Sequence, residues 1–228
     1  MTTGELISRT LRDCGEAAGS PVFYQRHEVL DALNEAQRLF CLATLCLEAD
    51  ASLNLAANTS FYYLIPNFPK FLVPLRVTVA NTGAKVRPAS LGSFDSLSET
   101  WLTDAGDPKY YDVVGADLLA ITPRPETTGT TLTIHYASAP DPLVADADVP
   151  QIPEEHHPTL VEYAVARLRA KEGGQEFLKA APRFGNFLRG AARMAEAVRK
   201  RTGGRYDRQP FEFTEWLRRY DAGKPANP

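Results

Sequence analysis

Glu154 and His157 have a spacing that could bind a metal ion. They lie three residues apart, where a carboxylate and an imidazole on one helix reach the same ion. A dinuclear carboxylate site needs a second such pair on a facing helix, and the sequence contains no second pair. Acidic residues are also favourable at the positive start of a helix, so the sequence favours a polar helix entrance.

A second candidate is the row His27, Asp31 and Glu35, which recurs every four residues on one helical face. Two carboxylates and an imidazole could hold a divalent ion. Charged residues at this spacing more often form a solvated stripe. His135 stands between Ile134 and Tyr136 in a strand-like run and is interpreted as a sheet residue.

The three cysteines, Cys14, Cys41 and Cys46, all fall in segments with helical periodicity. An odd number without paired spacing argues against a disulfide framework. Cys41 and Cys46 are five residues apart, which does not put them on one helical face, so a metal pair is not expected. The cysteines are interpreted as small buried hydrophobic residues.

Motifs for covalent catalysis or phosphate binding are missing from the sequence. It contains no Gly-x-Ser-x-Gly turn, no Walker-type loop and no Gly-x-Gly-x-x-Gly stretch. We therefore predict a non-enzymatic protein with no catalytic residue, metal or cofactor. The alternative is a metal-dependent hydrolase that uses Glu154, His157 and the His27 row.

Charge is divided unevenly along the chain. Lysine and arginine minus aspartate and glutamate give 25 − 28 = −3 overall, 6 − 13 = −7 for residues 50–158 and 12 − 5 = +7 for residues 159–208. Such polarity could align subunits head to tail or turn the basic segment toward a phosphate-rich partner; a solvated helix face is the alternative. The predicted subunit-contact or DNA-facing residues are Arg189, Arg193, Arg199, Lys200 and Arg201. The same residues would serve the other alternative, a nucleic-acid-binding module.

Apolar residues at helical spacing predict helices at both ends of the chain. The first pair covers 3–18, capped by Thr3, and 25–48. The second pair begins at Pro158 and at Phe177, and Pro182 is expected to break or kink the last helix. No apolar run approaches the roughly 18 residues of a membrane span, and the first residues lack the apolar core of a signal peptide. These features lead us to expect a soluble protein of a reducing cytoplasm.

Between these helices the period changes to alternation, which is typical of strands. We expect strands 52–56 and 61–65 to pair with each other, and strand 72–80 to lie at an edge or carry a bulge at Pro74. A turn leads to strand 85–87 and a short helix follows at 93–102. Strands 110–114, 117–122 and 130–137 are expected to form an antiparallel meander, because the region lacks long helical crossovers.

The predicted fold class is α+β, a helical bundle formed by the N- and C-terminal helices with an inserted antiparallel β-rich region. The bundle domain comprises 1–49 and 150–204, the insertion 50–149, and a docking tail 205–228. The tail is rich in aromatic residues, which is unusual for an unanchored segment. It is expected to dock on a partner; folding back onto its own domain is the alternative.

Five stretches, in this order, resemble the head-to-tail adaptor proteins of tailed phages, also called connectors. They are NEAQRLF (34–40), FYYLIPNF (61–68), PKYYDVVGADLLAITPRP (108–125), TLTIHYASAP (131–140) and VPQIPEEHHPTLVEYAVARL (149–168). The resemblance covers about residues 5–170 and rests on the order and spacing of these stretches. It is weaker toward the C-terminus.

The resemblance implies a bundle with a β-rich insertion, assembled as a ring, typically a dodecamer, beneath the portal and around a DNA channel. The implied partners are the portal protein, a tail or nozzle protein, further copies of the chain, and double-stranded DNA that passes without sequence recognition; no membrane is involved. The implied location is the virion neck, after synthesis in the bacterial cytoplasm. By analogy, the portal-binding residues are Phe211, Phe213, Trp216, Leu217 and Tyr220.

Overall fold

The computed structural model describes residues 1–212 and divides the chain into two compact units. The helical unit contains Met1–Leu47 and Ala139–Arg201, with the described residues from Pro210 on. The β unit contains Glu48–Ser138 and Thr202–Gln209. The chain therefore enters the β unit twice, once through the long central segment and once through a short segment after the last helix.

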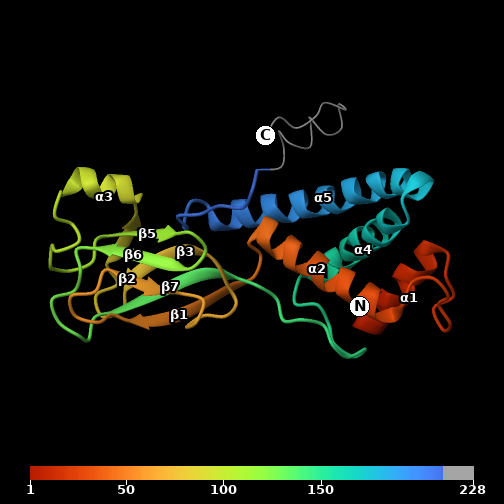
Figure 1. Ribbon diagram of the computed structural model, residues 1–228, viewed down its shortest axis with the longest axis horizontal. Coiled ribbons are helices and arrows are strands. Elements are labelled where there is room, and N and C mark those ends of the chain that lie inside the picture. The colour runs from red at the N-terminus through yellow and green to blue at the C-terminus, as the bar shows by residue number, and fades with distance from the viewer. Residues whose placement is uncertain (213–228) are drawn as a thin grey trace. The chain divides into compact units, whose positions relative to one another are not determined.

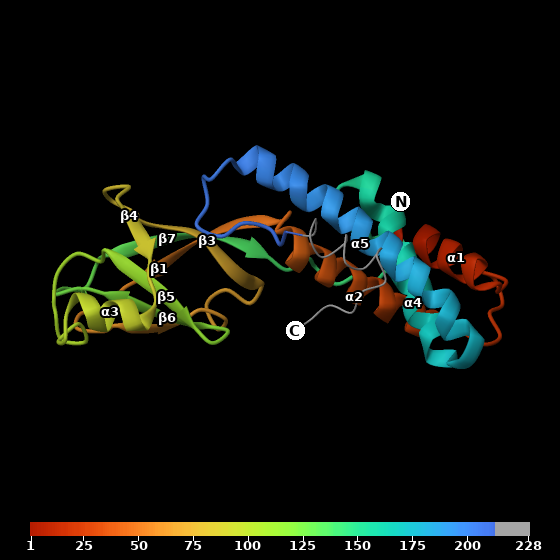
Figure 2. The same cartoon turned by 90° about the horizontal axis from the view of Figure 1, so that it is seen from above.

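The helical unit is built from four long helices (Figures 1 and 2). α1, α2 and α4 pack pairwise, and α5 adds Phe187, Ala191, Met194 and Val198 to their shared apolar core. Among residues 1–212, no helix combines the length and apolar character needed to cross a membrane. The bounds are α1 Thr3–Cys14, α2 Arg26–Thr44, a short 3-10 turn Glu154–His156, α4 His157–Glu172 and α5 Gly174–Thr202.

The first helix begins one residue earlier than its sequence pattern suggested. Thr2 is the N-cap and forms a capping box with Glu5. Thr3, the predicted cap, is buried and donates from its hydroxyl to the carbonyl of Asp148 at 3.0 Å. The helix ends where Gly15 takes a left-handed conformation with φ 89°, which glycine adopts without steric cost.

The last helix continues through Pro182, so of the two predicted alternatives the break is wrong, and the kink stays a prediction. A proline inside a helix removes one backbone hydrogen bond and costs about 3 kcal/mol. The residues that follow bury Phe187, Ala191 and Val198 in the core of the helical unit. Burying an apolar side chain contributes about 1.5–3 kcal/mol, so this packing outweighs the local cost of the proline.

α4 and α5 approach closely at Gly190. A Cβ atom placed on Gly190 would lie 2.4 Å from Cγ2 and 2.6 Å from Oγ1 of Thr159, which belongs to α4. Real Cβ atoms do not tolerate contacts this short. The two helices can therefore pack at this distance only because residue 190 has no side chain.

Residues 139–153, here called the strap, run along α2 without regular structure. Asn34 receives a hydrogen bond from the Leu143 backbone N–H at 2.7 Å and donates to its carbonyl at 3.0 Å. Gln37 donates to the carbonyl of Asp141 at 2.8 Å. Irregular backbone near a core needs such partners, so these two amides of the NEAQRLF stretch position the strap and the buried Leu143.

The β unit is a single curled sheet of seven strands that forms a half-barrel. The strand order is β1-β7-β3-β4-β5-β6-β2. All neighbours are antiparallel except β4 and β5, which are parallel. The bounds are β1 Glu48–Asn54, β2 Phe61–Tyr63, β3 Phe71–Val79, β4 Lys85–Pro88, β5 Tyr110–Val114, β6 Leu118–Thr122 and β7 Thr131–Ser138.

The sheet encloses an apolar core of its own, separate from that of the helical unit. A smaller cluster forms where α3, residues Leu91–Leu97, covers β5 and β6 (Figures 1 and 2). There Phe94 packs against Trp101 and Ala120, and the Trp101 indole donates to Asp95 at 2.8 Å. The larger core contains Leu53, Leu55, Leu64, Phe68, Phe71, Val77, Val86, Tyr111, Leu119, Ile121, Leu132, Ile134 and Tyr136.

The predicted fold class, a helical bundle with an inserted antiparallel β-rich region, is wrong. The observed fold is α+β with a curled seven-stranded mixed sheet and five α-helices in the described part of the chain. Residues 89–109, which contain α3, supply the crossover that parallel strands β4 and β5 require. The sheet is therefore mixed, and the β region is a folded unit with its own core.

The strand partners also differ from the prediction. β1 pairs with β7 and β2 pairs with β6, so these consecutive strands do not pair with each other. β5 and β6 form the expected hairpin. β7 pairs with β1 and β3 and not with β6, so the predicted meander of three consecutive strands is wrong. Pro74 lies at a register irregularity of β3, on a stretch that β4 does not reach, so the predicted bulge is confirmed.

We predict that Gly190→Ala destabilises the protein by about 1–3 kcal/mol, the usual cost of overpacking a core. The measurement is the free energy of unfolding from chemical denaturation. Gly92→Ala in α3 is the matched control, because its added Cβ would meet no atom within 4 Å. In a helix that substitution is neutral or stabilising.

The double variant Gly190→Ala/Thr159→Ala should recover part of the loss, since it removes the two closest atoms. Equal stability of Gly190→Ala and the unaltered protein would show that α4 and α5 cross at a greater distance.

Candidate functional site

The structure does not bring Glu154 and His157 to a common ion. His157 is 1% exposed, and its Nε2 lies 3.0 Å from the carbonyl of Ile152. Its Nδ1 lies 3.1 Å from the Met1 amine, which also contacts Glu154 at 3.2 Å. Both imidazole nitrogens thus have partners within the fold, and the histidine acts as a structural residue.

The carboxylates of the second helix meet cations of α4. Glu35 pairs with Arg167 at 3.2 Å, and Glu28 pairs with Lys171. The hydrogen bond from Lys171 holds the pKa of Glu28 below its usual value. Asp31 lies in the same groove between α2 and α4. Within residues 1–212, no group of three or more His, Cys, Asp or Glu side chains is placed to hold a metal ion.

His135 lies on β7 opposite Asp50 of β1, and its Nδ1 atom contacts the Asp50 carboxylate. The prediction that it is a sheet residue is confirmed. β1 is an edge strand and β7 is its neighbour, so this contact helps to hold the sheet together and has a structural role.

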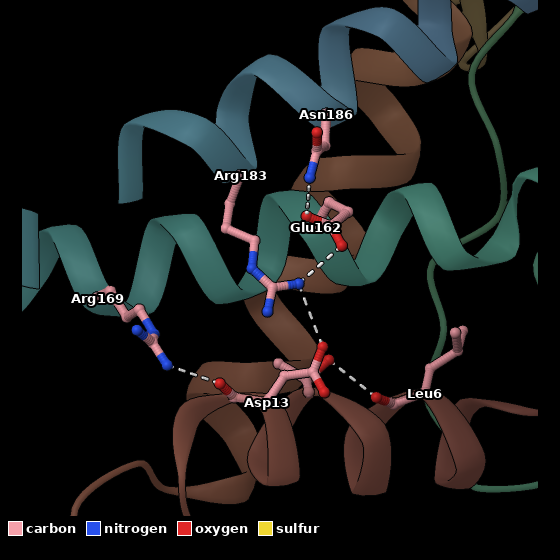
Figure 3. Close-up of polar contacts among 7 residues, drawn as sticks. Leu6, Asp13, Glu162, Arg169, Arg183 and Asn186 are labelled. Carbon is pink, nitrogen blue, oxygen red and sulfur yellow. Dashed lines mark hydrogen bonds and ion pairs between the residues drawn. The ribbon is translucent and has the colours of Figure 1, made fainter. Parts of the chain in front are cut away.

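The five cations of α4 and the first half of α5 make ion pairs within the helical unit. Figure 3 shows the most connected one: Arg183 on α5 reaches Glu162 of α4 at 2.7 Å and Asp13 of α1 at 3.3 Å. Asn186 donates to the other oxygen of Glu162 at 2.9 Å, and Arg169 donates to the carbonyl of Asp13 at 2.7 Å. The set is Arg167, Arg169, Lys171, Lys179 and Arg183.

The predicted contact residues Arg189, Arg193, Arg199, Lys200 and Arg201 all lie on the C-terminal half of α5. Arg189, Arg193 and Lys200 recur at helical spacing on the exposed side of the helix, opposite the face that carries Ala191 and Val198. We call these three residues the basic stripe. Arg189 contacts Asn186 at 2.8 Å and Lys200 contacts Glu196 at 2.8 Å, both one turn away on α5.

After α5, residues 202–209 return to the β unit, and Asp207 anchors them there. The Asp207 N–H donates to the carbonyl of Leu75 at 2.6 Å, on the stretch of β3 that β4 leaves uncovered. Its carboxylate is 6% exposed and pairs with Lys85 at 2.6 Å. The Tyr111 hydroxyl donates to the same carboxylate at 3.3 Å.

Burial and the adjacent Asp207 raise the pKa of Tyr111, so its hydroxyl stays protonated as a donor. A second contact comes from Tyr206, whose hydroxyl donates to Glu48 at 2.6 Å. The start of the predicted docking tail therefore binds the sheet of its own chain. Sequence reasoning missed this anchor because one aspartate in RYDRQP carries no periodic signal.

Of the predicted portal-binding residues, the structure describes Phe211, which is 57% exposed. Phe213, Trp216, Leu217 and Tyr220 lie outside the described residues. Phe211 follows the anchored segment by two positions. The anchor at Asp207 thus determines where on the β unit the tail begins.

A comparison with protein families matches the SU10 adaptor protein family over residues 1–210. The chain belongs to that family. No curated protein matches the chain. The SU10 adaptors are a phage head-to-tail adaptor family, so the resemblance noted in the sequence is confirmed. The family match ends at residue 210, which includes the Asp207 anchor and excludes every predicted portal-binding residue.

Membership of the SU10 adaptors carries three consequences for this chain. The protein is a structural component of a phage particle, and its partners are other phage structural proteins. A structural family favours a non-enzymatic role. The functional surfaces to look for in this adaptor are therefore surfaces that contact other proteins.

We predict that Asp207→Asn lowers the free energy of unfolding by about 1–3 kcal/mol, because it leaves Lys85 without its charged partner. Denaturation followed by tryptophan fluorescence measures the change. Glu126→Gln, the same change of a carboxylate to an amide at an exposed position of the β unit, is the control and should have little effect.

Asp207→Asn and Lys85→Gln combined should cost less than the sum of the single changes, because the second change removes the unpaired charge. Strict additivity would mean that the two side chains do not interact.

Proposed function

We propose that this SU10 adaptor assembles as a closed ring that joins the portal to a tail or nozzle protein and surrounds the DNA exit channel. The supporting observation is the family match over residues 1–210. A ring of identical subunits needs a heterologous interface, in which two different surfaces of the chain meet. The protein must therefore carry two complementary surfaces.

The basic stripe is the first of these surfaces in our proposal. Its side chains project from the face of α5 opposite the core and are exposed. The partner surface in our proposal consists of three of the exposed carboxylates in the β unit of the neighbouring subunit. Its members are Glu99, Asp107 and Glu126.

Opposite charges on two surfaces increase the rate of association and select the correct register more than they increase affinity. Repulsion between like charges also penalises wrong pairings, in which two basic or two acidic surfaces meet. The charge division between residues 50–158 and 159–208 would then guide head-to-tail assembly. Apolar contacts would supply most of the affinity.

The tail is the proposed portal contact, with Phe211, Phe213, Trp216, Leu217 and Tyr220 as anchors. Aromatic residues supply much of the energy at protein interfaces. The Asp207 anchor supports this role, because it fixes the point on the β unit from which the tail extends.

A second role for the basic stripe is contact with passing DNA, favoured by three exposed cations on one helical face. Such contact would be independent of sequence and would weaken steeply with salt. It differs from the subunit role in one measurable respect: the isolated chain would bind DNA at low salt.

We predict rings in negative-stain images of the purified protein mixed with portal. Reversing the stripe with Arg189→Glu/Arg193→Glu/Lys200→Glu should abolish the rings. Adding Glu99→Lys/Asp107→Lys/Glu126→Lys should restore them, because complementarity returns with opposite sign. Arg38→Glu, a charge reversal on the exposed face of α2, is the control.

A strict monomer both alone and with portal would exclude ring formation. Rings that survive reversal of the stripe would exclude it as the contact between subunits. If the same variant also loses DNA binding at low salt, the stripe would instead be a DNA-contacting surface.

We predict that deletion of residues 213–228 weakens portal affinity by about 100-fold or more, as expected when several aromatic anchors are removed. The deletion keeps Asp207 and its contacts, so the β unit stays intact; a cut before Asp207 would damage the fold as well. Deletion of residues 224–228 alone, which spares every proposed anchor, should leave the affinity unchanged. Calorimetry with purified portal measures both variants, and equal affinities would exclude the tail as the contact.

A further inference from the structure

The end of α2 brings two cysteines together that a continuous helix would keep apart. α2 ends at Thr44, and Leu45 takes a left-handed conformation with φ 52° and ψ 35°. This turn carries Cys46 back toward the helix. The sulfur atoms of Cys41 and Cys46 consequently lie 4.0 Å apart. The prediction that the two residues do not face each other holds for a helix but not for this cap.

The turn is held by specific contacts. The Leu45 N–H donates to the Cys41 carbonyl at 2.8 Å, the hydrogen bond that closes a left-handed helix cap. The Leu45 side chain is 6% exposed. A left-handed conformation is unfavourable for leucine, so burial of this side chain and the cap hydrogen bond keep it in place. The short distance between the thiols is therefore a built feature of the cap.

The two thiols differ in access and acidity. Cys41 is 1% exposed, whereas Cys46 is partly exposed. The hydrogen bond with Cys41 lowers the pKa of Cys46, and Thr44 and the Arg201 charge act in the same direction. The shared hydrogen bond and burial raise the pKa of Cys41. Cys46 is thus the thiol that ionises first and that a small reagent can reach.

We propose that Cys41 and Cys46 form a reversible intramolecular disulfide at the C-terminal cap of α2. The oxidant is a small-molecule disulfide such as glutathione disulfide. The Cys46 thiolate attacks one of its sulfurs, forms a mixed disulfide and releases a glutathione thiolate. Cys41 then loses its proton to that thiolate, attacks the Cys46 sulfur and releases the second glutathione. Two protein thiols are oxidised and one disulfide is reduced to two thiols.

The geometry permits this product with small movements. The sulfurs must approach from 4.0 Å to about 2 Å, and Cys46 lies beyond the end of α2, partly buried against the core of the helical unit. A bond here would connect the last turn of α2 to the residue that precedes Leu47 and β1. It would lock the cap in its left-handed turn.

A phage protein meets two redox environments, the cytoplasm of the host and the outside of the cell; this argument rests on the family assignment. Thiols stay reduced in the bacterial cytoplasm and are oxidised outside it. Cys41 and Cys46 would therefore be free thiols during assembly in the cell and would form the disulfide after release of the particle.

The test exposes the purified full-length protein to glutathione disulfide, quenches by alkylation and digests with trypsin. Arg38 and Lys70 are the flanking cleavage sites, so both cysteines fall in one peptide, residues 39–70. We expect that peptide to lose about 2 Da and to resist alkylation until it is reduced. Cys14 is the internal control: burial raises its pKa to about 11, and it should remain alkylatable.

Single variants separate the two roles. Cys41→Ser should stop at the mixed disulfide, with about 305 Da of glutathione retained on Cys46. Cys46→Ser should react far more slowly, and Cys14→Ser should behave as the unaltered protein. Oxidation should raise the melting temperature of the unaltered protein and of Cys14→Ser, and dithiothreitol should reverse the rise.

A glutathione adduct that persists on Cys46 when Cys41 is present would overturn the proposal. So would two free thiols at these positions after equilibration with excess oxidant. Neither result depends on ring formation or portal binding, so the disulfide and the proposed function fail independently.

Discussion

The paired hydrogen bonds between Asn34 and the backbone of Leu143 connect the two parts of the helical unit across the longest gap in its sequence. α1 and α2 precede the β unit in the chain, whereas α4 and α5 follow it. The strap is the first segment to return, and it has no regular structure that could satisfy its own backbone. Asn34 and Gln37 provide donors and an acceptor at the required positions, and further along the strap Asp146 and Asp148 accept from the first N–H groups of α1. One irregular segment thus aligns both N-terminal helices.

Apolar packing supplies most of the stability of that arrangement, and the ion pairs contribute less. The side chains of Asp13, Glu162 and Arg183 are about a quarter to a third exposed, and pairs in such surroundings contribute about 1 kcal/mol or less. Each core residue that α5 buries contributes about 1.5–3 kcal/mol. The close contact between Gly190 and Thr159 then restricts where α5 can lie. Arg167, Lys171 and Arg183 each meet a carboxylate of α1 or α2, so these three ion pairs favour the observed helix order.

Local signals in the sequence predicted the elements, and long-range pairing explains what they missed. Helical periodicity located α1, α2 and α4, with ends shifted by caps such as the Thr2 and Glu5 box. Alternation located most strands, but strand partners depend on contacts far apart in sequence, such as β1 with β7. A short helix was expected at 93–102 and is found at 91–97, but its place in the crossover between parallel strands was not expected. The Cys41 and Cys46 contact was missed for a related reason, since it depends on a leucine in a conformation that leucine rarely adopts.

The basic segment shows how far charge alone can be interpreted. Residues 159–208 carry 12 cations, and sequence cannot say which of them are used within the fold. The structure separates them by position: those from Arg167 to Arg183 pair with carboxylates of the helical unit, whereas the basic stripe lies on the far side of α5 from the core. Charges of the first kind are tied to folding. In the second group, Arg189 and Lys200 bond residues one turn away on α5, and the apolar face of α5 lies on the opposite side of the helix. In our proposal, folding depends on cations of α4 and the first half of α5, and assembly depends on cations of the second half of α5, so the contact surface could change while the adaptor fold is retained.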